Sequence, residues 1–149
     1  MYKKILIPVD GSKLSKDSAE QGIIFAKEKN AEIIILFIKQ SFGSLLGFDG
    51  ANAGYLRRSA ITYEETMTIE AEKITNEVKE LADGAGVKNK IIISSNFHPA
   101  DGIIEVSENE SCDLIFIPTH GRSGLKKLVL GSVASKVITL SKIPVLIHR

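Results

Sequence analysis

The residues best suited to bind a ligand lie in a glycine-containing stretch that follows an apolar segment near the C-terminus. The apolar segment, residues 114–117, has the length and composition of a buried strand. It is followed by Gly121, Gly124 and the pair Gly131-Ser132, and residues 133–140 then have the pattern of a helix. Glycines let backbone amides approach a ligand closely, and a helix N-terminus leaves N–H groups without intrahelical acceptors. Together these parts predict an anion site.

Positive charge is concentrated in the same part of the chain. From Pro118 to the C-terminus the sequence has no Asp or Glu, and its basic residues there are Arg122, Lys126, Lys127, Lys136, Lys142 and Arg149. The local field therefore also favours an anion. The whole chain has a formal net charge of only +1, which gives no reason to expect a nucleic acid or an acidic membrane surface as a partner.

Composition is that of an ordinary globular protein. The 149 residues are 44% hydrophobic and 25% charged, so we expect one domain, residues 1–149, with a core of its own. The single cysteine, Cys112, excludes a disulfide framework and is expected to be a small buried hydrophobe. His98 and His148 lack metal-ligand spacing and are expected at the surface. The sequence shows no signal-peptide pattern and no apolar run of roughly 18 residues, so we expect a cytoplasmic protein that does not enter the membrane.

Alternating strands and helices must position the glycine-containing stretch. The expected strands are residues 4–9, 32–38, 90–95, 113–118 and 143–148, and the expected helices are residues 13–29, 62–85, 99–109 and 133–140. Ser12 and Asn30 are suited to cap the first helix. In the helix of residues 62–85, the apolar stripe is Met67, Ala71, Ile74, Val78 and Leu81. This alternation predicts an α/β fold with one doubly wound parallel sheet and helices on both faces.

Residues 39–61 have no clear period and contain four glycines among several apolar side chains. A loop of this length is usually functional or mobile, and its apolar content argues against simple disorder. Two interpretations remain open. The segment is either a lid or a surface covered by another subunit, or it is a local insertion that packs on its own domain.

The common nucleotide fingerprints are absent. After the first strand the chain reads Asp10-Gly11-Ser12, which begins neither a dinucleotide motif nor a P-loop. In a doubly wound sheet, ligands bind beyond the carboxyl ends of the strands where the strand order reverses. If the first and fourth strands are neighbours, Asp10 and Gly121 face the same crevice.

In the order and spacing of several segments, the chain resembles the universal stress protein family over essentially its whole length. The matching segments are residues 4–12, 113–117, 119–125, 130–133 and 143–147. The resemblance implies a Rossmann-like, adenine nucleotide alpha hydrolase-like fold with five parallel strands in the order 3-2-1-4-5. It also implies a homodimer paired through the last strand and, in one branch of the family, ATP between strands one and four.

By this resemblance, Asp10 would lie at the ribose or metal side and the main chain around Ile38 would face the base. Gly121, Gly131 and Ser132 would hold phosphates, accompanied by Mg or Mn. The other residues that the resemblance places around the nucleotide are Pro8, Val9, Thr119, His120, Arg122 and Val133. Each has a simpler interpretation: Asp10 could close a turn, the glycines could be turn residues, and Ser132 could be only an N-cap.

Two positions depart from the family pattern. The ATP-binding branch carries G-x-x-G, nine residues and then G-[ST], and Pro118 stands at the first glycine. Proline lacks an N–H and would add bulk near the ribose. Phe97 stands where the family often has a glycine two residues before a proline, and could fill part of the crevice or stack on the base.

The apolar last strand and the nucleotide motif lead to a main prediction and two alternatives. Val145, Leu146 and Ile147 would lie at a sheet edge, which a second copy would cover unless residues 39–61 cover it. The main prediction is a stress-response or regulatory protein that binds ATP or a related adenine nucleotide. The alternatives are a slow ATP hydrolase, for which only His120 and Asp10 are candidate catalytic groups, and a nucleotide-free dimeric interaction module.

Overall fold

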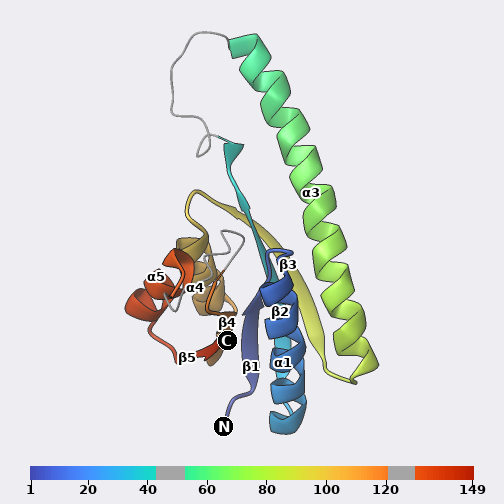
Figure 1. Ribbon diagram of the computed structural model, residues 1–149, viewed down its shortest axis with the longest axis vertical. Coiled ribbons are helices and arrows are strands. Elements are labelled where there is room, and N and C mark those ends of the chain that lie inside the picture. The colour runs from blue at the N-terminus through green and yellow to red at the C-terminus, as the bar shows by residue number, and fades with distance from the viewer. Residues whose placement is uncertain (43–52, 121–129) are drawn as a thin grey trace.

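A five-stranded parallel sheet in the order β3-β2-β1-β4-β5 forms the centre of the computed structural model (Figure 1). The structure describes residues 1–42, 53–120 and 130–149. The strands are β1 Lys4–Pro8, β2 Glu32–Gln40, β3 Asn89–Asn96, β4 Leu114–Pro118 and β5 Val145–His148. The helices are α1 Lys13–Lys29, α3 Ala53–Gly84, α4 Pro99–Asn109 and α5 Ser132–Leu140. The predicted fold class and strand order are confirmed.

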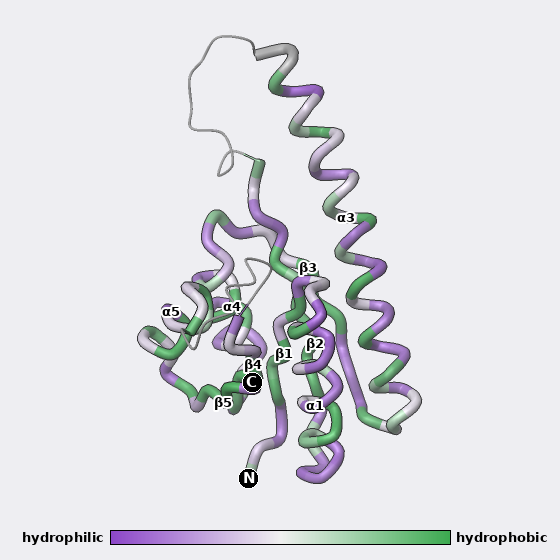
Figure 2. The backbone as a smooth tube through the Cα atoms, viewed as in Figure 1, coloured by the Kyte–Doolittle hydropathy of each residue, from purple (hydrophilic) through white to green (hydrophobic). Residues whose placement is uncertain are grey.

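Two hydrophobic cores lie on opposite faces of the sheet. Because successive side chains of a strand point to opposite faces, Ile5 and Ile7 of β1 pack beneath α1 and α3, whereas Leu6 packs against α4 and α5. The central strands carry apolar side chains on both faces, as expected of a parallel sheet covered by helices. In Figure 2, α3 by contrast alternates between hydrophilic and hydrophobic residues along its length. The helices therefore cover both faces, as predicted.

Helix α1 packs closely on the sheet and has both predicted caps. The Ser12 hydroxyl accepts a hydrogen bond from the Ser15 N–H at 3.2 Å, and Asn30 takes a left-handed conformation at the C-terminus. At Gly22, an added Cβ would lie 2.8 Å from Ile7 Cδ1 and 3.3 Å from Phe116 Cδ1. The glycine thus permits the close contact of helix and sheet.

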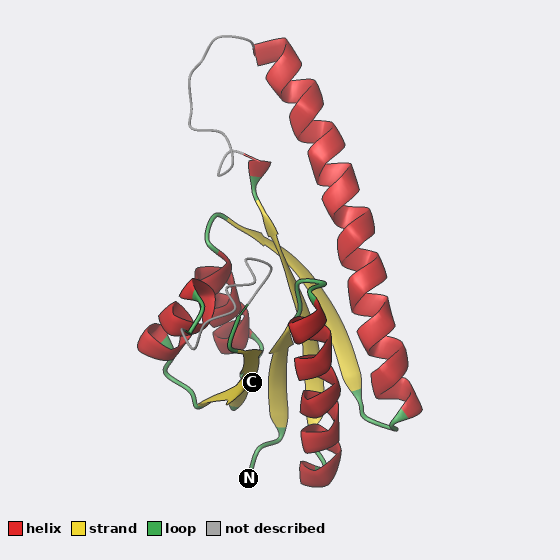
Figure 3. Ribbon diagram, viewed as in Figure 1, coloured by secondary structure: helices red, strands yellow, loops and turns green. Residues whose placement is uncertain are grey.

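The predicted bounds of the loop, residues 39–61, are wrong at both ends, because regular structure extends into the segment from each side. Strand β2 continues to Gln40, and α3 begins already at Ala53. This end of α3 extends beyond the sheet (Figure 3), and none of residues 56–61 is buried, which explains why their sequence has no apolar period. Residues 43–52 lie outside the described residues. The two interpretations of this segment, a lid or covered surface and a local insertion, therefore stay predictions.

Two smaller expectations also need correction. Leu81 is 39% exposed, and Ala82 instead continues the buried stripe of α3 with Ala71 and Val78. His148 is half-buried rather than at the surface, with its ring stacked on Phe116 at a centroid distance of 6.1 Å. Within the described ranges, no helix has the length and apolarity needed to cross a membrane.

Candidate functional site

A pocket of about 540 Å³ lies at the carboxyl ends of the strands, and unequal strand lengths create it. The pairing of β1 with β2 stops at Pro8 opposite Leu36, whereas β2 continues to Gln40. The short central strand therefore forms the floor of a crevice between its longer neighbour and the start of α5. The volume falls in the range of about 300 to 1,000 Å³ typical of small-molecule sites.

Most of the residues that the sequence nominated line this pocket. They are Pro8, Val9, Asp10, Ile38, His120, Gly131, Ser132 and Val133. Gly121 and Arg122 lie outside the described residues. Thr119 is not a lining residue, but its main chain connects the parts of the site. Its N–H donates to the His148 carbonyl at 2.9 Å, and its carbonyl accepts from the Gly131 N–H at 2.7 Å.

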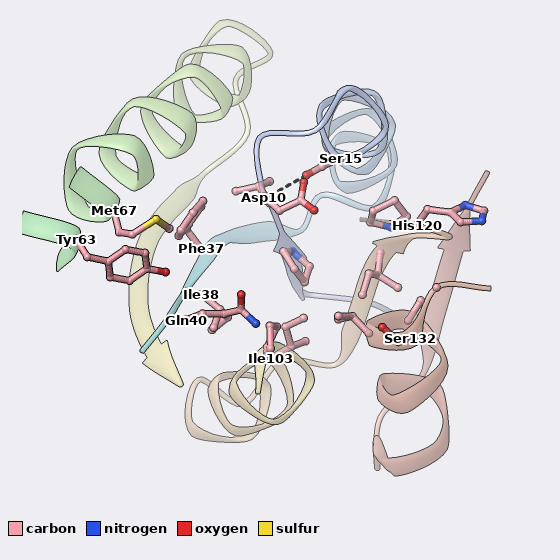
Figure 4. A pocket seen from close by; sticks show the side chains of 18 residues that line it. Asp10, Ser15, Phe37, Ile38, Gln40, Tyr63, Met67, Ile103, His120 and Ser132 are labelled. Carbon is pink, nitrogen blue, oxygen red and sulfur yellow. Dashed lines mark hydrogen bonds between the residues drawn. The ribbon is translucent and has the colours of Figure 1, made fainter. Parts of the chain in front are cut away.

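Asp10 lies at the turn between β1 and α1 and also faces the pocket. Its Oδ1 accepts a hydrogen bond from the Ser12 N–H at 2.9 Å, and its own N–H donates to the Ser15 hydroxyl at 3.0 Å, drawn as a dashed line in Figure 4. Gly11 completes this turn with a φ of +82°. Asp10 therefore does close the turn, and the same hydrogen bonds hold its carboxylate at the pocket wall.

The polar end of the pocket is the start of α5. Gly131 is the N-cap and Ser132 is the first helical residue, which corrects the suggestion that Ser132 is the cap. The first amides of a helix lack intrahelical acceptors and carry partial positive charge, so this end favours an anionic group. Beside it, the Thr119 hydroxyl and His120 Nδ1 form a hydrogen bond of 2.8 Å.

The opposite end of the pocket is apolar and was largely missed from the sequence. It includes Phe37 and Gln40 of β2, Tyr63 and Met67 of α3, and Pro99 and Ile103 of α4. Figure 4 shows Tyr63 and Met67 on one side of this end and Ile103 on the other. No local signal marks the end of β2, because the apolar run of residues 33–38 stops before Lys39 and Gln40. Nothing local to residues 63–67 indicates that they reach the strand ends.

The two departures from the family pattern have different consequences. Pro118 is buried and lines the pocket, paired in register with His148 at the end of β4. Phe97 is 54% exposed and is not a lining residue, and its ring contacts that of His98 edge-on at 5.0 Å. Of the two possibilities for Phe97, filling part of the crevice is therefore wrong, because the side chain is exposed and does not line the pocket.

The positive field expected from the C-terminal segment is partly neutralised. Lys136 forms an ion pair with Asp101 at 2.8 Å, and Lys142 forms one with Glu108 at 3.0 Å. Both acidic partners belong to α4, which packs beside α5. These two lysines consequently join the helices rather than contribute unpaired charge to the pocket.

Metal ligation and thiol chemistry have little support in the described parts of the chain. There, no group of three or more His, Cys, Asp or Glu side chains could hold a metal ion. Cys112 is 5% exposed, as predicted, and its burial raises the pKa of the thiol to about 11. The thiol is thus protonated at neutral pH and acts as a small apolar group.

Comparison with known proteins agrees with the fold. The sequence profile of the universal stress protein family matches residues 1–149. Universal stress protein MJ0577 of Methanocaldococcus jannaschii is 34% identical over 159 aligned residues, which cover the whole chain and 96% of that protein. The solved structure of MJ0577 is similar with a TM-score of 0.83 and 29% identity, covering 99% of this chain and 95% of that one.

Two more distant structures of the same fold contain nucleotides. A universal stress protein in complex with cAMP has a TM-score of 0.64 and 21% identity, with 99% of this chain and 97% of that one covered. The universal stress protein of Archaeoglobus fulgidus in complex with dAMP has a TM-score of 0.67 and 17% identity, with 99% and 98% covered. The match of the family profile over the whole length shows that this chain belongs to the universal stress protein family.

Proposed function

We propose that this chain is a cytoplasmic stress-response or regulatory protein that binds ATP or a related adenine nucleotide in the pocket at the strand ends. The observation that carries the proposal is the division of the pocket into an apolar end and a polar end. Phe37, Ile38 and Ile103 offer apolar area to a base, and the start of α5 offers backbone amides to a phosphate. The cAMP and dAMP complexes of two proteins with this fold support the proposal.

In this arrangement Asp10 would accept hydrogen bonds from the ribose hydroxyls, and Gly131 and Ser132 would contact the phosphates. Val9 and Pro8 would form the floor, and His120 would flank the phosphate end. The binding roles of Thr119, Gly121, Arg122 and Val133 remain predictions from the sequence. Mg or Mn would arrive with a polyphosphate rather than occupy a site formed by the protein.

Binding without efficient turnover fits the described lining residues best. Among them, Asp10 is the carboxylate and His120 the imidazole, and each is already hydrogen-bonded within the protein. Fast phosphoryl transfer needs a group that orients the attacking water, together with charge stabilisation of the transferred group. We therefore expect at most slow ATP hydrolysis.

Calorimetric titration of ligand-free protein with Mg-ATP, AMP and cAMP tests this function. Ser132→Ala should weaken the binding of phosphate-bearing ligands by roughly tenfold to a hundredfold, because a hydrogen bond to a charged group contributes roughly 1.5 to 3 kcal/mol. Ser135→Ala is the matched control, since Ser135 is exposed on the same helix and does not line the pocket. Absence of heat and of a thermal shift with all three ligands would reject the proposal and favour the nucleotide-free interaction module.

We also propose a homodimer paired through the outer edge of β5. Val145, Leu146 and Ile147 are only half-buried, and nearby Ile138 and Leu140 of α5 are 43% and 49% exposed. A twofold copy of the same strand would satisfy the edge and cover apolar surface. Leu146→Lys should convert a dimer into a monomer in sedimentation velocity. A wild-type protein that is monomeric at micromolar concentration would contradict this proposal.

A further inference from the structure

Helix α3 forms a wall of the pocket at its apolar end. Tyr63 and Met67 lie one helical turn apart on α3 and are half-buried. Met67 also packs against the core beneath α3. Figure 4 shows both side chains directed toward the pocket, across from Ile103 of α4. The apolar end is therefore a slot with one wall from α3 and the other from α4.

The extra length of β2 explains how side chains from both faces of the sheet reach the slot. Phe37 belongs to the core beneath α1 and α3, whereas Ile38 packs against the core of α4 and α5. The alternation continues, so that Lys39 faces α3 and Gln40 faces α4. Since the pairing with β1 ends at Leu36, the last residues of β2 border an open space instead of a neighbouring strand on that side.

Lys39 attaches α3 to the end of β2 next to this wall. Its Nζ donates to Glu64 Oε2 at 3.1 Å and to the Thr68 hydroxyl at 3.2 Å. The Lys39 side chain is 16% exposed, so its ion pair with Glu64 is partly shielded from water. Glu64 and Thr68 each follow a wall residue by one position. The same contact that secures the helix thus sets the position of Tyr63 and Met67.

This inference rests on the proposed function. We propose that Met67 and Tyr63 contact the nucleobase and make the site prefer a purine over a pyrimidine, with Lys39 as a positioning residue. A thioether and an aromatic ring both interact favourably with a planar ring, and the gain rises with the area in contact. A purine offers two fused rings to the slot and a pyrimidine offers one. The Gln40 amide supplies a donor and an acceptor at the edge of the base.

Calorimetric titrations with AMP, CMP and ribose 5-phosphate test the assignment. The wild type should bind AMP more tightly than CMP. Met67→Ala and Tyr63→Ala should each weaken AMP by about tenfold, in line with the cost of removing a base-stacking side chain. CMP should lose less, and ribose 5-phosphate should be unaffected. Met67→Leu and Tyr63→Phe keep the wall and should retain most of the preference.

Two further variants distinguish residues that contact the base from a residue that only positions the α3 wall. Ile69→Ala is the matched control on α3, because Ile69 is 68% exposed and lies away from the pocket. Lys39→Met should reduce the ratio of AMP to CMP affinity in the wild-type background and add little when Met67 is already alanine, because both changes act on the same wall. Additive effects of the two substitutions would overturn the positioning role of Lys39.

The outcomes distinguish this inference from the function on which it rests. If AMP binds and the ratio of AMP to CMP affinity is unchanged in folded Met67→Ala and Tyr63→Ala proteins, the α3 wall does not contact the base and the inference is overturned. Thermal unfolding identifies a variant that does not fold. If one of Met67→Ala and Tyr63→Ala fails to fold, the affinities of the other variant test the inference. If the wild type binds no adenine nucleotide, the proposed function itself fails.

Discussion

Alanine substitutions at Gly102 of α4 and Gly22 of α1 should distinguish overpacking of the core, which lowers stability, from displacement of a pocket residue, which lowers ligand affinity. In each helix, an alanine Cβ would lie 2.8 Å from the Cδ1 of an isoleucine, Ile38 for Gly102 and Ile7 for Gly22. Such an approach requires the isoleucine to move. Ile38 lines the pocket and has space to rotate into, whereas Ile7 is fully buried and has none. The same substitution should therefore have opposite consequences at the two sites.

The magnitudes follow from two opposing terms. Replacing glycine by alanine within a helix stabilises it by about 1 kcal/mol, and overpacking a core costs roughly 1 to 3 kcal/mol. At Gly22 the cost dominates, because Phe116 Cδ1 at 3.3 Å also resists the new methyl group. We expect a net loss of about 1 kcal/mol, which corresponds to a decrease in Tm of roughly 2 to 4 °C. At Gly102 the two terms nearly cancel, although Asn96 Cβ at 3.0 Å must also give slightly.

Ligand binding should show the reverse order. In Gly102→Ala, rotation of Ile38 fills part of the slot, so AMP affinity should fall about tenfold, equivalent to about 1.4 kcal/mol. In Gly22→Ala the pocket is untouched and the affinity should be unchanged. Urea unfolding and calorimetry on both variants measure the two quantities. If Gly102→Ala destabilises the protein as much as Gly22→Ala and leaves AMP affinity intact, the reasoning from the free space beside Ile38 is refuted.

Two further predictions concern groups with shifted pKa values. A hydrogen bond from Lys88 lowers the pKa of Glu32, and Lys4 adds to the effect. The resulting stabilisation is present above the ordinary pKa and is lost as the pH falls through the lowered value. Glu32→Gln should therefore cost no more than about 1 kcal/mol at neutral pH and flatten the loss of stability below about pH 5 in urea titrations; an unchanged acid limb would contradict this. Because burial raises the pKa of Cys112 to about 11, its thiol should react with a disulfide reagent at pH 7.5 only after unfolding, and rapid labelling of the folded protein would show that the thiol is accessible.

Much of the fold follows from local patterns in the sequence. The apolar strands, the capping residues Ser12 and Asn30 and the helix of residues 99–109 depend on neighbours within a few residues, so periodicity and cap chemistry identify them. The polar end of the candidate site is predictable for the same reason. A glycine and a serine at a helix start leave backbone amides without intrahelical acceptors, and the short segment after β4 keeps them near the end of that strand.

The apolar end of the site depends on contacts between distant segments. Whether Tyr63 and Met67 face a pocket depends on where α3 crosses β2, and the ion pair of Lys39 with Glu64 sets that crossing. The exposure of Phe97 and the pairing of Lys136 with Asp101 likewise depend on how α4 packs. The sequence by itself therefore determined the strands, the helices that connect them and the polar half of the site. Only the tertiary structure decided the apolar half, because the unequal ends of β1 and β2 and the position of α3 arise from the packing of segments far apart in the chain.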